Sequence, residues 1–173
     1  NVIFELPANY DSSTEIFPVH FYKFSTGGNP YNVIIRPAAG ATIVSQGDPG
    51  TGNSLIELNG IERLTLDGRA GGTGNAINWI VRNTRTATTV GPTIRFLNVA
   101  AENTLTYLQL EGQNISTSSG TLVFGTSASG SMGSSNNTVS NCQIRNRSDV
   151  PSPLPANPVY AAGTSGRVNT YNS

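Results

Sequence analysis

The chain has 173 residues, of which 10 are acidic and 10 are basic, so its formal net charge near pH 7 is zero. Scattered arginines and a single lysine argue against a nucleic-acid partner, and no apolar stretch approaches the roughly 20 residues that span a membrane. One cysteine excludes a disulfide framework, while many Ser, Thr, Asn and Gly residues suit an extracellular protein.

The N-terminal part of the chain contains two strand-like runs. Alternating apolar residues predict strands over 2–6 (VIFEL) and 17–24 (FPVHFYKF). Residues 1–30 are therefore expected to form the first coils of a solenoid or a cap on it, followed by repeats over 31–173. His20 is out of phase with the apolar residues around it, which predicts a solvent-facing side chain. Since no second histidine exists, we expect neither a His-based triad nor a metal site, and no cofactor is expected.

A short phrase, Asn-x-aliphatic-x-x-(Leu/Cys)-x-(Leu/Ile), occurs three times, at 59–66, 103–110 and 137–144. A phrase that returns every few tens of residues predicts a stacked-repeat architecture, in which each unit buries its apolar face against its neighbours. Asn59, Asn103 and Asn137 occupy one position of the phrase. Because Asn tolerates left-handed backbone and forms amide ladders, we expect these side chains to stack or hydrogen-bond at a corner of the repeat.

Each phrase follows a companion run that also looks like a strand, at 54–58, 93–97 and 121–125. Between the first and second units lies a further apolar run over 76–83 (AINWIVRN). It fits the end of the phrase only if Trp79 and Val81 take the places of Leu64 and Leu66. We interpret it as an extra turn of the solenoid.

Strand rather than helix is indicated throughout, because apolar positions alternate and Gly, Asn, Pro and Ser interrupt the chain every six to twelve residues. Short strands, loops of unequal length and a repeated register favour an all-β fold, a right-handed parallel β-helix. Its interior is expected to hold the alternating residues of the phrases: Leu64, Leu66, Leu108, Leu110, Cys142 and Ile144. Cys142 is expected to act as a small buried hydrophobe, not as a nucleophile or a metal ligand.

The C-terminal part contains a Pro-rich loop over 148–158 and then a run over 159–166 that looks like the companion of a fourth unit. No complete phrase follows it, so the last repeat is expected to be incomplete. Because an uncovered solenoid end invites aggregation, we expect the chain to be a piece of a longer protein.

A family resemblance covers nearly the whole chain. It is carried by the succession VIFELPANY, EIFPVHF, NVIIRPAAGATIVSQG, SLIELNGIERLTLDGR, TIRFLNVAAENT, NNTVSNCQIRN and VYAAGTSG. This succession resembles the right-handed β-helix regions of very large surface and secreted proteins of Bacteroidetes, which are similar in fold to pectate lyases. The resemblance implies secretion, often by the type IX system, and a role at the cell surface as an adhesin or stalk. Implied partners are environmental or cell-surface polysaccharides and the secretion machinery.

A polysaccharide-active enzyme is the alternative. Asp67 and Glu111 both follow the phrase at one position, and Arg145 takes that position in the third unit, as Arg82 does in the extra turn. Two carboxylates separated by one coil would lie within the range used by inverting glycosidases. Trp79 and Tyr107 are the aromatic candidates for sugar binding.

A ladder of alternating charges that stabilises neighbouring coils is the interpretation we favour for these residues. The clustered aspartates and the basic motifs of polygalacturonases and pectate lyases are missing. We therefore expect a non-catalytic structural or adhesive module that forms an elongated display scaffold.

Overall fold

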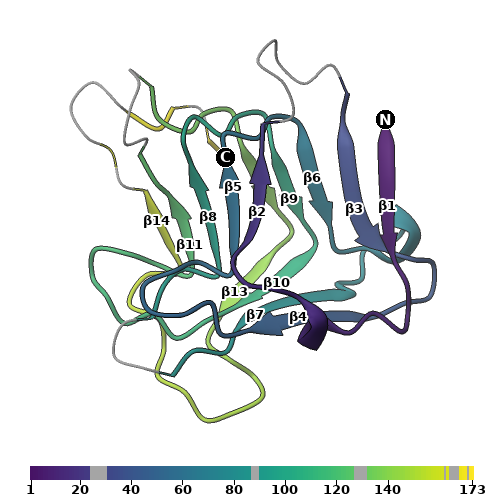
Figure 1. Cartoon of the computed structure of the whole chain (residues 1–173), viewed down its shortest axis with the longest axis horizontal. Coiled ribbons are helices and arrows are strands. Elements are labelled where there is room, and N and C mark those ends of the chain that lie inside the picture. The colour runs from purple at the N-terminus through teal and green to yellow at the C-terminus, as the bar shows by residue number, and fades with distance from the viewer. Residues whose placement is uncertain (24–30, 87–89, 127–131, 162, 164–167, 171) are drawn as a thin grey trace.

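The computed structural model describes residues 1–23, 31–86, 90–126, 132–161, 163, 168–170 and 172–173. Within them the fold is all-β, with strands in three sheets whose neighbours all pair in parallel (Figure 1). The chain visits the sheets in turn and so winds a parallel β-helix, as the sequence predicted. The only helical segments described are the short 3-10 helices η1 (Ser12–Thr14) and η2 (Ala70–Gly72).

Each sheet collects one strand from successive coils. Sheet 1 contains β1 (Val2–Leu6), β3 (Val33–Pro37), β6 (Leu64–Asp67), β9 (Thr104–Thr106) and β12 (Thr138–Ser140). Sheet 2 contains β4 (Ile43–Gly47), β7 (Trp79–Asn83), β10 (Leu108–Glu111) and β13 (Gln143–Arg145). Sheet 3 contains β2 (Val19–Tyr22), β5 (Ile56–Asn59), β8 (Ile94–Leu97), β11 (Leu122–Phe124) and β14 (Val159–Ala161).

The first coil differs from the four that follow it. Its strands β1 and β2 pair with β3 and β5, but on the side of sheet 2 it contributes η1 in place of a strand. There the Ser12 hydroxyl accepts a hydrogen bond from the backbone N–H of Gln46, 3.1 Å away. The expected strand over 17–24 is found as β2, with His20 exposed, and residue 24 lies outside the described residues.

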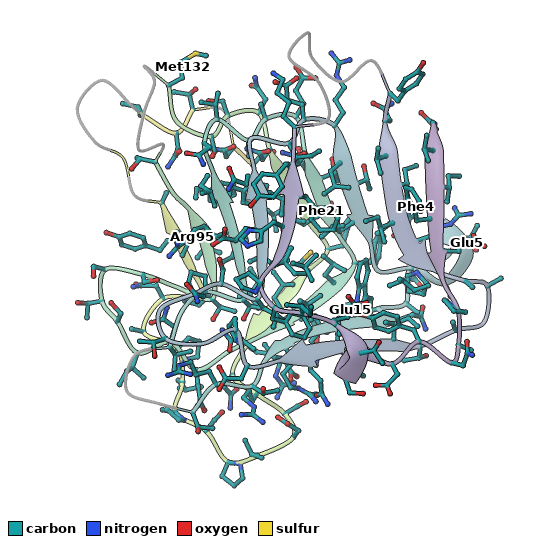
Figure 2. The ribbon with its side chains drawn as sticks, in the orientation of Figure 1. Phe4, Glu5, Glu15, Phe21, Arg95 and Met132 are labelled. Carbon is teal, nitrogen blue, oxygen red and sulfur yellow. The ribbon has the colours of Figure 1, made fainter. Side chains whose placement is uncertain are left out.

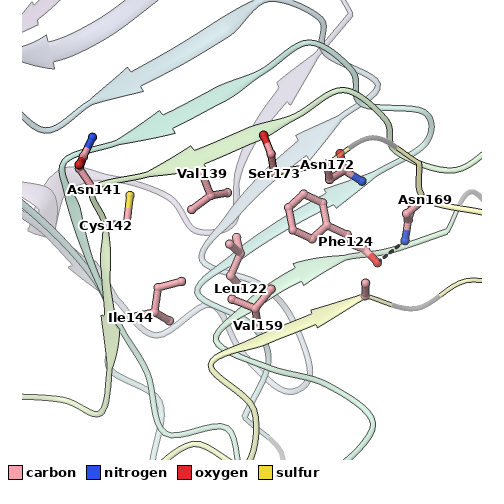
Figure 3. A pocket seen from close by; sticks show the side chains of 11 residues that line it. Leu122, Phe124, Val139, Asn141, Cys142, Ile144, Val159, Asn169, Asn172 and Ser173 are labelled. Atoms are coloured by element: carbon pink, nitrogen blue, oxygen red, sulfur yellow. Dashed lines mark hydrogen bonds between the residues drawn. The ribbon is translucent and has the colours of Figure 1, made fainter.

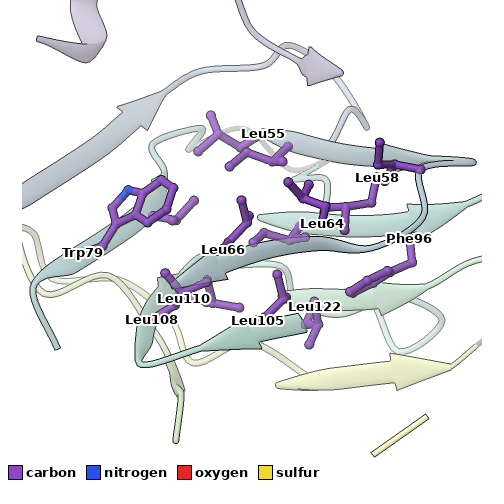
Figure 4. Packing of buried hydrophobic residues seen from close by; sticks show 14 of the residues in the cluster. Leu55, Leu58, Leu64, Leu66, Trp79, Phe96, Leu105, Leu108, Leu110 and Leu122 are labelled. Carbon is purple, nitrogen blue, oxygen red and sulfur yellow. The ribbon is translucent and has the colours of Figure 1, made fainter. Parts of the chain in front are cut away.

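The hydrophobic core lies between the three sheets and is built from columns of like residues (Figure 4). In sheet 3, Ile56, Ile94 and Leu122 stack in one column. In the next column of that sheet the rings of Phe96 and Phe124 stack with centroids 4.7 Å apart. Alternation along short strands thus produces a continuous core, because identical phases face inward on every coil.

A residue with left-handed backbone forms the tight corner between sheets 1 and 2 in the last two coils. Tyr107 alone joins β9 to β10 with φ of 52°, and Asn141, with φ of 53°, is the first of the two residues between β12 and β13. A left-handed conformation is unusual for a bulky residue such as tyrosine. The corner is therefore enforced by the parallel ladders on either side of it.

The register of the first phrase differs from the expectation. Leu66 pairs with Leu105 in sheet 1, so Leu64 occupies the position of Asn103, whereas the alignment of phrases placed it with Leu108. The reason is an insertion: β9 and β10 are joined by one residue, but residues 68–78 separate β6 from β7. The run over 76–83 is consequently not an extra turn, because it supplies the sheet 2 strand of the same coil.

The companion runs also need one correction. Ile56 pairs with Ile94, so the first companion is shifted by one residue from the expected alignment with 93–97. The alignment of the second and third companions is confirmed, since Ile94 pairs with Leu122. The expected run over 159–166 begins as β14, and its residues 162 and 164–166 lie outside the described residues.

Within the described residues, no helix is long and apolar enough to cross a membrane.

Candidate functional site

An asparagine ladder lies at the corner where the chain leaves sheet 3 and enters sheet 1. The side-chain oxygen of Asn137 accepts hydrogen bonds from the backbone N–H and the side-chain amide of Asn103, at 3.1 and 2.9 Å. Asn172 receives the same two bonds from Asn137, at 2.9 and 3.0 Å. Asn103 and Asn137 are completely buried. The ladder is thus a structural element, whose third member is Asn172.

Asn59, expected in this ladder, is not part of it. It ends β5 in sheet 3, where its side-chain oxygen accepts a hydrogen bond from the amide of Asn98 at 2.6 Å. Leu64 stands at the ladder position of that coil, and its backbone N–H donates to the Asn103 oxygen at 3.0 Å. The ladder therefore ends at Leu64 because a leucine side chain has no amide with which to continue it.

The predicted charge column exists, but with a different membership. In sheet 2, Glu111 pairs with Arg82 on one side and with Arg145 on the other. Asp67 lies in sheet 1, where it pairs with Thr106, so the expectation that it stacks with Glu111 is wrong. The two carboxylates that were candidates for a general acid and base therefore belong to different sheets.

Glu111 is buried beneath the segment that follows β13. Its carboxylate accepts hydrogen bonds from Arg82 Nε at 2.6 Å and from Gln109 Nε2 at 2.5 Å. The backbone N–H of Ser148 donates to the same carboxylate at 3.2 Å. Burial by itself raises the pKa of Glu111, but the hydrogen bonds from Ser148, Arg82 and Gln109 outweigh it and hold this pKa below its usual range. The pair of Glu111 and Arg82, expected as part of a surface charge ladder, is thus buried. It connects the segment around Ser148 to sheet 2.

The same segment is fixed by a second ion pair. Arg147 makes two hydrogen bonds to the Asp149 carboxylate, at 3.0 and 2.7 Å, and Arg82 Nε lies 3.5 Å from it. Arg147 also donates to the backbone carbonyl of Thr84 at 2.8 Å. Arg82 therefore lies between two carboxylates, and the network joins three successive coils.

Asp67 is engaged by its own neighbour along the chain. Its two carboxylate oxygens accept hydrogen bonds from Arg69 Nε and Nη2, at 2.9 and 2.8 Å. The Arg69 guanidinium in turn lies over the ring of Tyr107, 4.9 Å from its centroid. Tyr107, an expected sugar-binding residue, is half-buried in this contact at the corner. A fork of two bonds leaves Asp67 poorly suited to proton transfer.

Trp79, the other aromatic candidate for sugar binding, is not exposed. Its side chain lies in the core, 4% exposed, and stacks between Ile43 and Leu108 of neighbouring coils. The indole N–H donates to the hydroxyl of Ser45 at 2.9 Å. The placement of Trp79 at an interior position of the phrase, in register with Leu108, is confirmed, and a buried indole is unavailable to a sugar at the surface.

A shallow groove lies on the outer face of sheet 3. It has a volume of about 310 Å³ and is lined by Arg95, Leu97, Ser118, Ser119, Val123, Gly125, Thr126 and Tyr160. Figure 2 shows Arg95 beside the strands of this sheet. Sequence reasoning did not identify this groove. Alignment of the companion runs in their correct register would have placed Glu57, Arg95, Val123 and Tyr160 in one outward column.

The end of the core beyond the last coil forms a cavity of about 580 Å³ (Figure 3). Leu122, Phe124, Val139, Cys142, Ile144 and Val159 supply its apolar lining. Cys142 lies in the column of Leu108 and is partly buried, and burial raises the pKa of its thiol. In the described residues no group of three or more His, Cys, Asp and Glu side chains is placed to hold a metal ion.

Comparison of the chain with models of known protein families, with curated proteins and with solved structures gives no match.

Proposed function

We propose that the chain is a non-catalytic structural or adhesive module of an exported bacterial cell-surface protein, in which the solenoid serves as an elongated display scaffold. The observation that carries the proposal is the position of Glu111. Its side chain is fully buried and paired with Arg82 at 2.6 Å. A carboxylate that is shielded from substrate and held ionised by an arginine is a poor general acid.

The position of Asp67 supports the same function. Asp67 belongs to another sheet and is occupied by Arg69. Both glycosidase mechanisms need two carboxyl groups that face one sugar bond, and Asp67 and Glu111 share neither a sheet nor a column. The residues instead strengthen the solenoid, which is the property that a scaffold requires.

Export and surface display rest on the resemblance to β-helix regions of Bacteroidetes proteins that are secreted by the type IX system. An antibody against the chain should label intact cells of the source bacterium. Labelling that requires permeabilised cells would contradict the surface location.

The alternative, a polysaccharide-cleaving β-helix, is tested by incubating the protein with pectic and algal polysaccharides. We expect neither reducing ends nor unsaturated products to accumulate above a heat-denatured control. Product release that disappears in Asp67→Asn or Glu111→Gln, with the variants folded by circular dichroism, would overturn the non-catalytic proposal.

A further inference from the structure

The outer face of sheet 3 carries a column of mostly polar and aromatic side chains, interrupted by one valine. In register from β2 to β14 its members are His20, Glu57, Arg95, Val123 and Tyr160. The groove described above lies over the last three of these strands. Gly125, directly after β11, lines the groove without a side chain, and Ser118 and Ser119 border the groove from the preceding loop.

Arg95 is the cation of this groove, and its side chain is 34% exposed. Its contact with a carboxylate is long: Nη1 lies 3.9 Å from Glu57 Oε1, beyond hydrogen-bond distance. Glu57 is already satisfied by the Ser54 hydroxyl at 2.8 Å and by His20 Nδ1 at 3.0 Å. The Arg95 guanidinium therefore keeps its fork of donors available.

Most other arginines of the chain are differently placed. Six of those in the described residues lie within hydrogen-bond distance of a carboxylate: Arg36, Arg63, Arg69, Arg82, Arg85 and Arg147. Arg145 is exposed on the edge strand β13. Like Arg95, it lies within hydrogen-bond distance of no carboxylate among the described residues. Arg95 differs from Arg145 in bordering a groove, which makes the two a matched pair for experiment.

We propose that the groove binds a carboxylate-bearing sugar ring of an acidic polysaccharide. Arg95 supplies the forked donors that match a carboxylate. The hydroxyls of Ser118, Ser119 and Thr126 can exchange hydrogen bonds with sugar hydroxyls. Leu97 and the ring of Tyr160, both partly exposed, offer apolar surface for the sugar ring.

An acidic peptide fits the groove less well. An extended peptide gains most of its affinity by pairing with an unpaired strand edge. Here β8 is paired with β5 and β11, and β11 is paired with β8 and β14. In the described residues β14 is the outer strand of sheet 3, and the groove lies over side chains of β8, β11 and β14 and not along the unpaired edge of β14.

Calorimetric titration of the protein with a short oligogalacturonate tests the proposal, and the fully methyl-esterified oligomer serves as the uncharged control. We expect heat of binding for the acid and none for the ester. Arg95→Ala should weaken binding about 10- to 100-fold, the effect of losing a charge-assisted hydrogen bond. Arg145→Ala should leave it within about twofold, because an exposed single charge on sheet 2, outside the groove lining, contributes little.

Further variants separate the groups. Arg95→Lys keeps the charge without the fork, and Tyr160→Ala removes the ring; each should weaken binding, while circular dichroism shows an intact fold. Equal losses in Arg95→Ala and Arg145→Ala, equal binding of poly-glutamate, or no binding by the parent protein would each overturn the proposal. Binding and cleavage are measured separately. If the protein does not bind the oligogalacturonate, the proposed scaffold function still stands. If the protein cleaves a polysaccharide, only the proposed non-catalytic scaffold function is contradicted.

Discussion

The side-chain oxygen of Asn137 accepts two hydrogen bonds from Asn103, one from the backbone N–H and one from the side-chain amide. Each amide nitrogen of the ladder also donates to a backbone carbonyl of the preceding coil: Asn103 to Ile61 at 3.0 Å and Asn137 to Ala100 at 3.0 Å. Asn103 and Asn137 therefore each add a second hydrogen bond to a carbonyl that already accepts one from a backbone N–H, and the oxygen of Asn103 accepts the backbone N–H of Leu64.

Replacement of Asn103 by alanine should destabilise the fold by about 1–3 kcal/mol, because the backbone N–H of Leu64 loses its side-chain partner, whereas the carbonyl of Ile61 keeps the hydrogen bond from the backbone N–H of Ala101. Urea denaturation followed by circular dichroism measures this cost. Asn59→Ala is the control, since Asn59 lies outside the ladder, and it should cost less than about 1 kcal/mol. Equal costs for the two variants would show that the ladder is not special.

The repeat of the Asn103 and Asn137 phrases was readable from the sequence because both coils turn from sheet 1 to sheet 2 at an equivalent left-handed residue with no insertion. The first phrase was misaligned for a physical reason. An alternating Leu-x-Leu pattern faces the core equally well in any of the three sheets, so Leu64 and Leu66 match β6 and β10 alike. Only the insertion over 68–78 distinguishes the alignment with β6 from the alignment with β10. The alternation of apolar residues contains no information about that insertion.

The candidate site was less predictable than the fold. Glu111 and Arg82 were correctly placed side by side, but the burial of Glu111 depends on the segment around Ser148, 37 residues further along the chain. Local pattern describes which face a residue occupies and not which loop covers that face. The availability of Arg95 likewise depends on Glu57 being occupied by other groups, a property that only packing determines.

The buried Glu111 pair should make stability depend on pH. Because its pKa is lower in the folded protein than in the unfolded chain, its carboxylate stabilises the fold above the unfolded value of about 4.3, and this contribution disappears as pH falls through the folded value. Glu111→Gln should cost about 3–5 kcal/mol at pH 7, where Arg82 loses the nearer and more deeply buried of its two counter-charges, and less in acid. Urea midpoints measured from pH 7 to pH 3 test this.

Glu102→Gln is the matched control for the pH experiment. Glu102 pairs with Arg63 at 2.8 Å, but its side chain is 51% exposed. An exposed pair contributes about 0–1 kcal/mol. Parallel stability curves for Glu111→Gln and the parent protein across this pH range would contradict the role assigned to Glu111.

Trp79 provides an intrinsic probe of the core. As the sole tryptophan, with 4% of its surface exposed, it should emit at short wavelength and resist quenching by acrylamide in the folded protein. Saccharides should leave its emission unchanged, because the groove lies on the outer face of sheet 3. Easy quenching, or an emission change on saccharide binding, would place Trp79 at the surface. Trp79→Phe should cost about 1–2 kcal/mol through the lost bond to Ser45.

Gly68 follows β6 and permits a close approach of two coils at the corner between sheets 1 and 2. A Cβ atom there would overlap the backbone carbonyl of Tyr107, and the backbone N–H of Gly68 donates to Thr106 at 2.8 Å. Gly68→Ala should therefore cost about 1–3 kcal/mol, since the obstacle is backbone and cannot rotate away.

Gly163→Ala is the control, since a Cβ at Gly163 would meet no atom within 4 Å, and it should change stability by less than about 0.5 kcal/mol. Thermal melts of the two variants and the parent protein compare these costs. If Gly68→Ala melts together with Gly163→Ala, the coils at this corner are further apart than the structure places them.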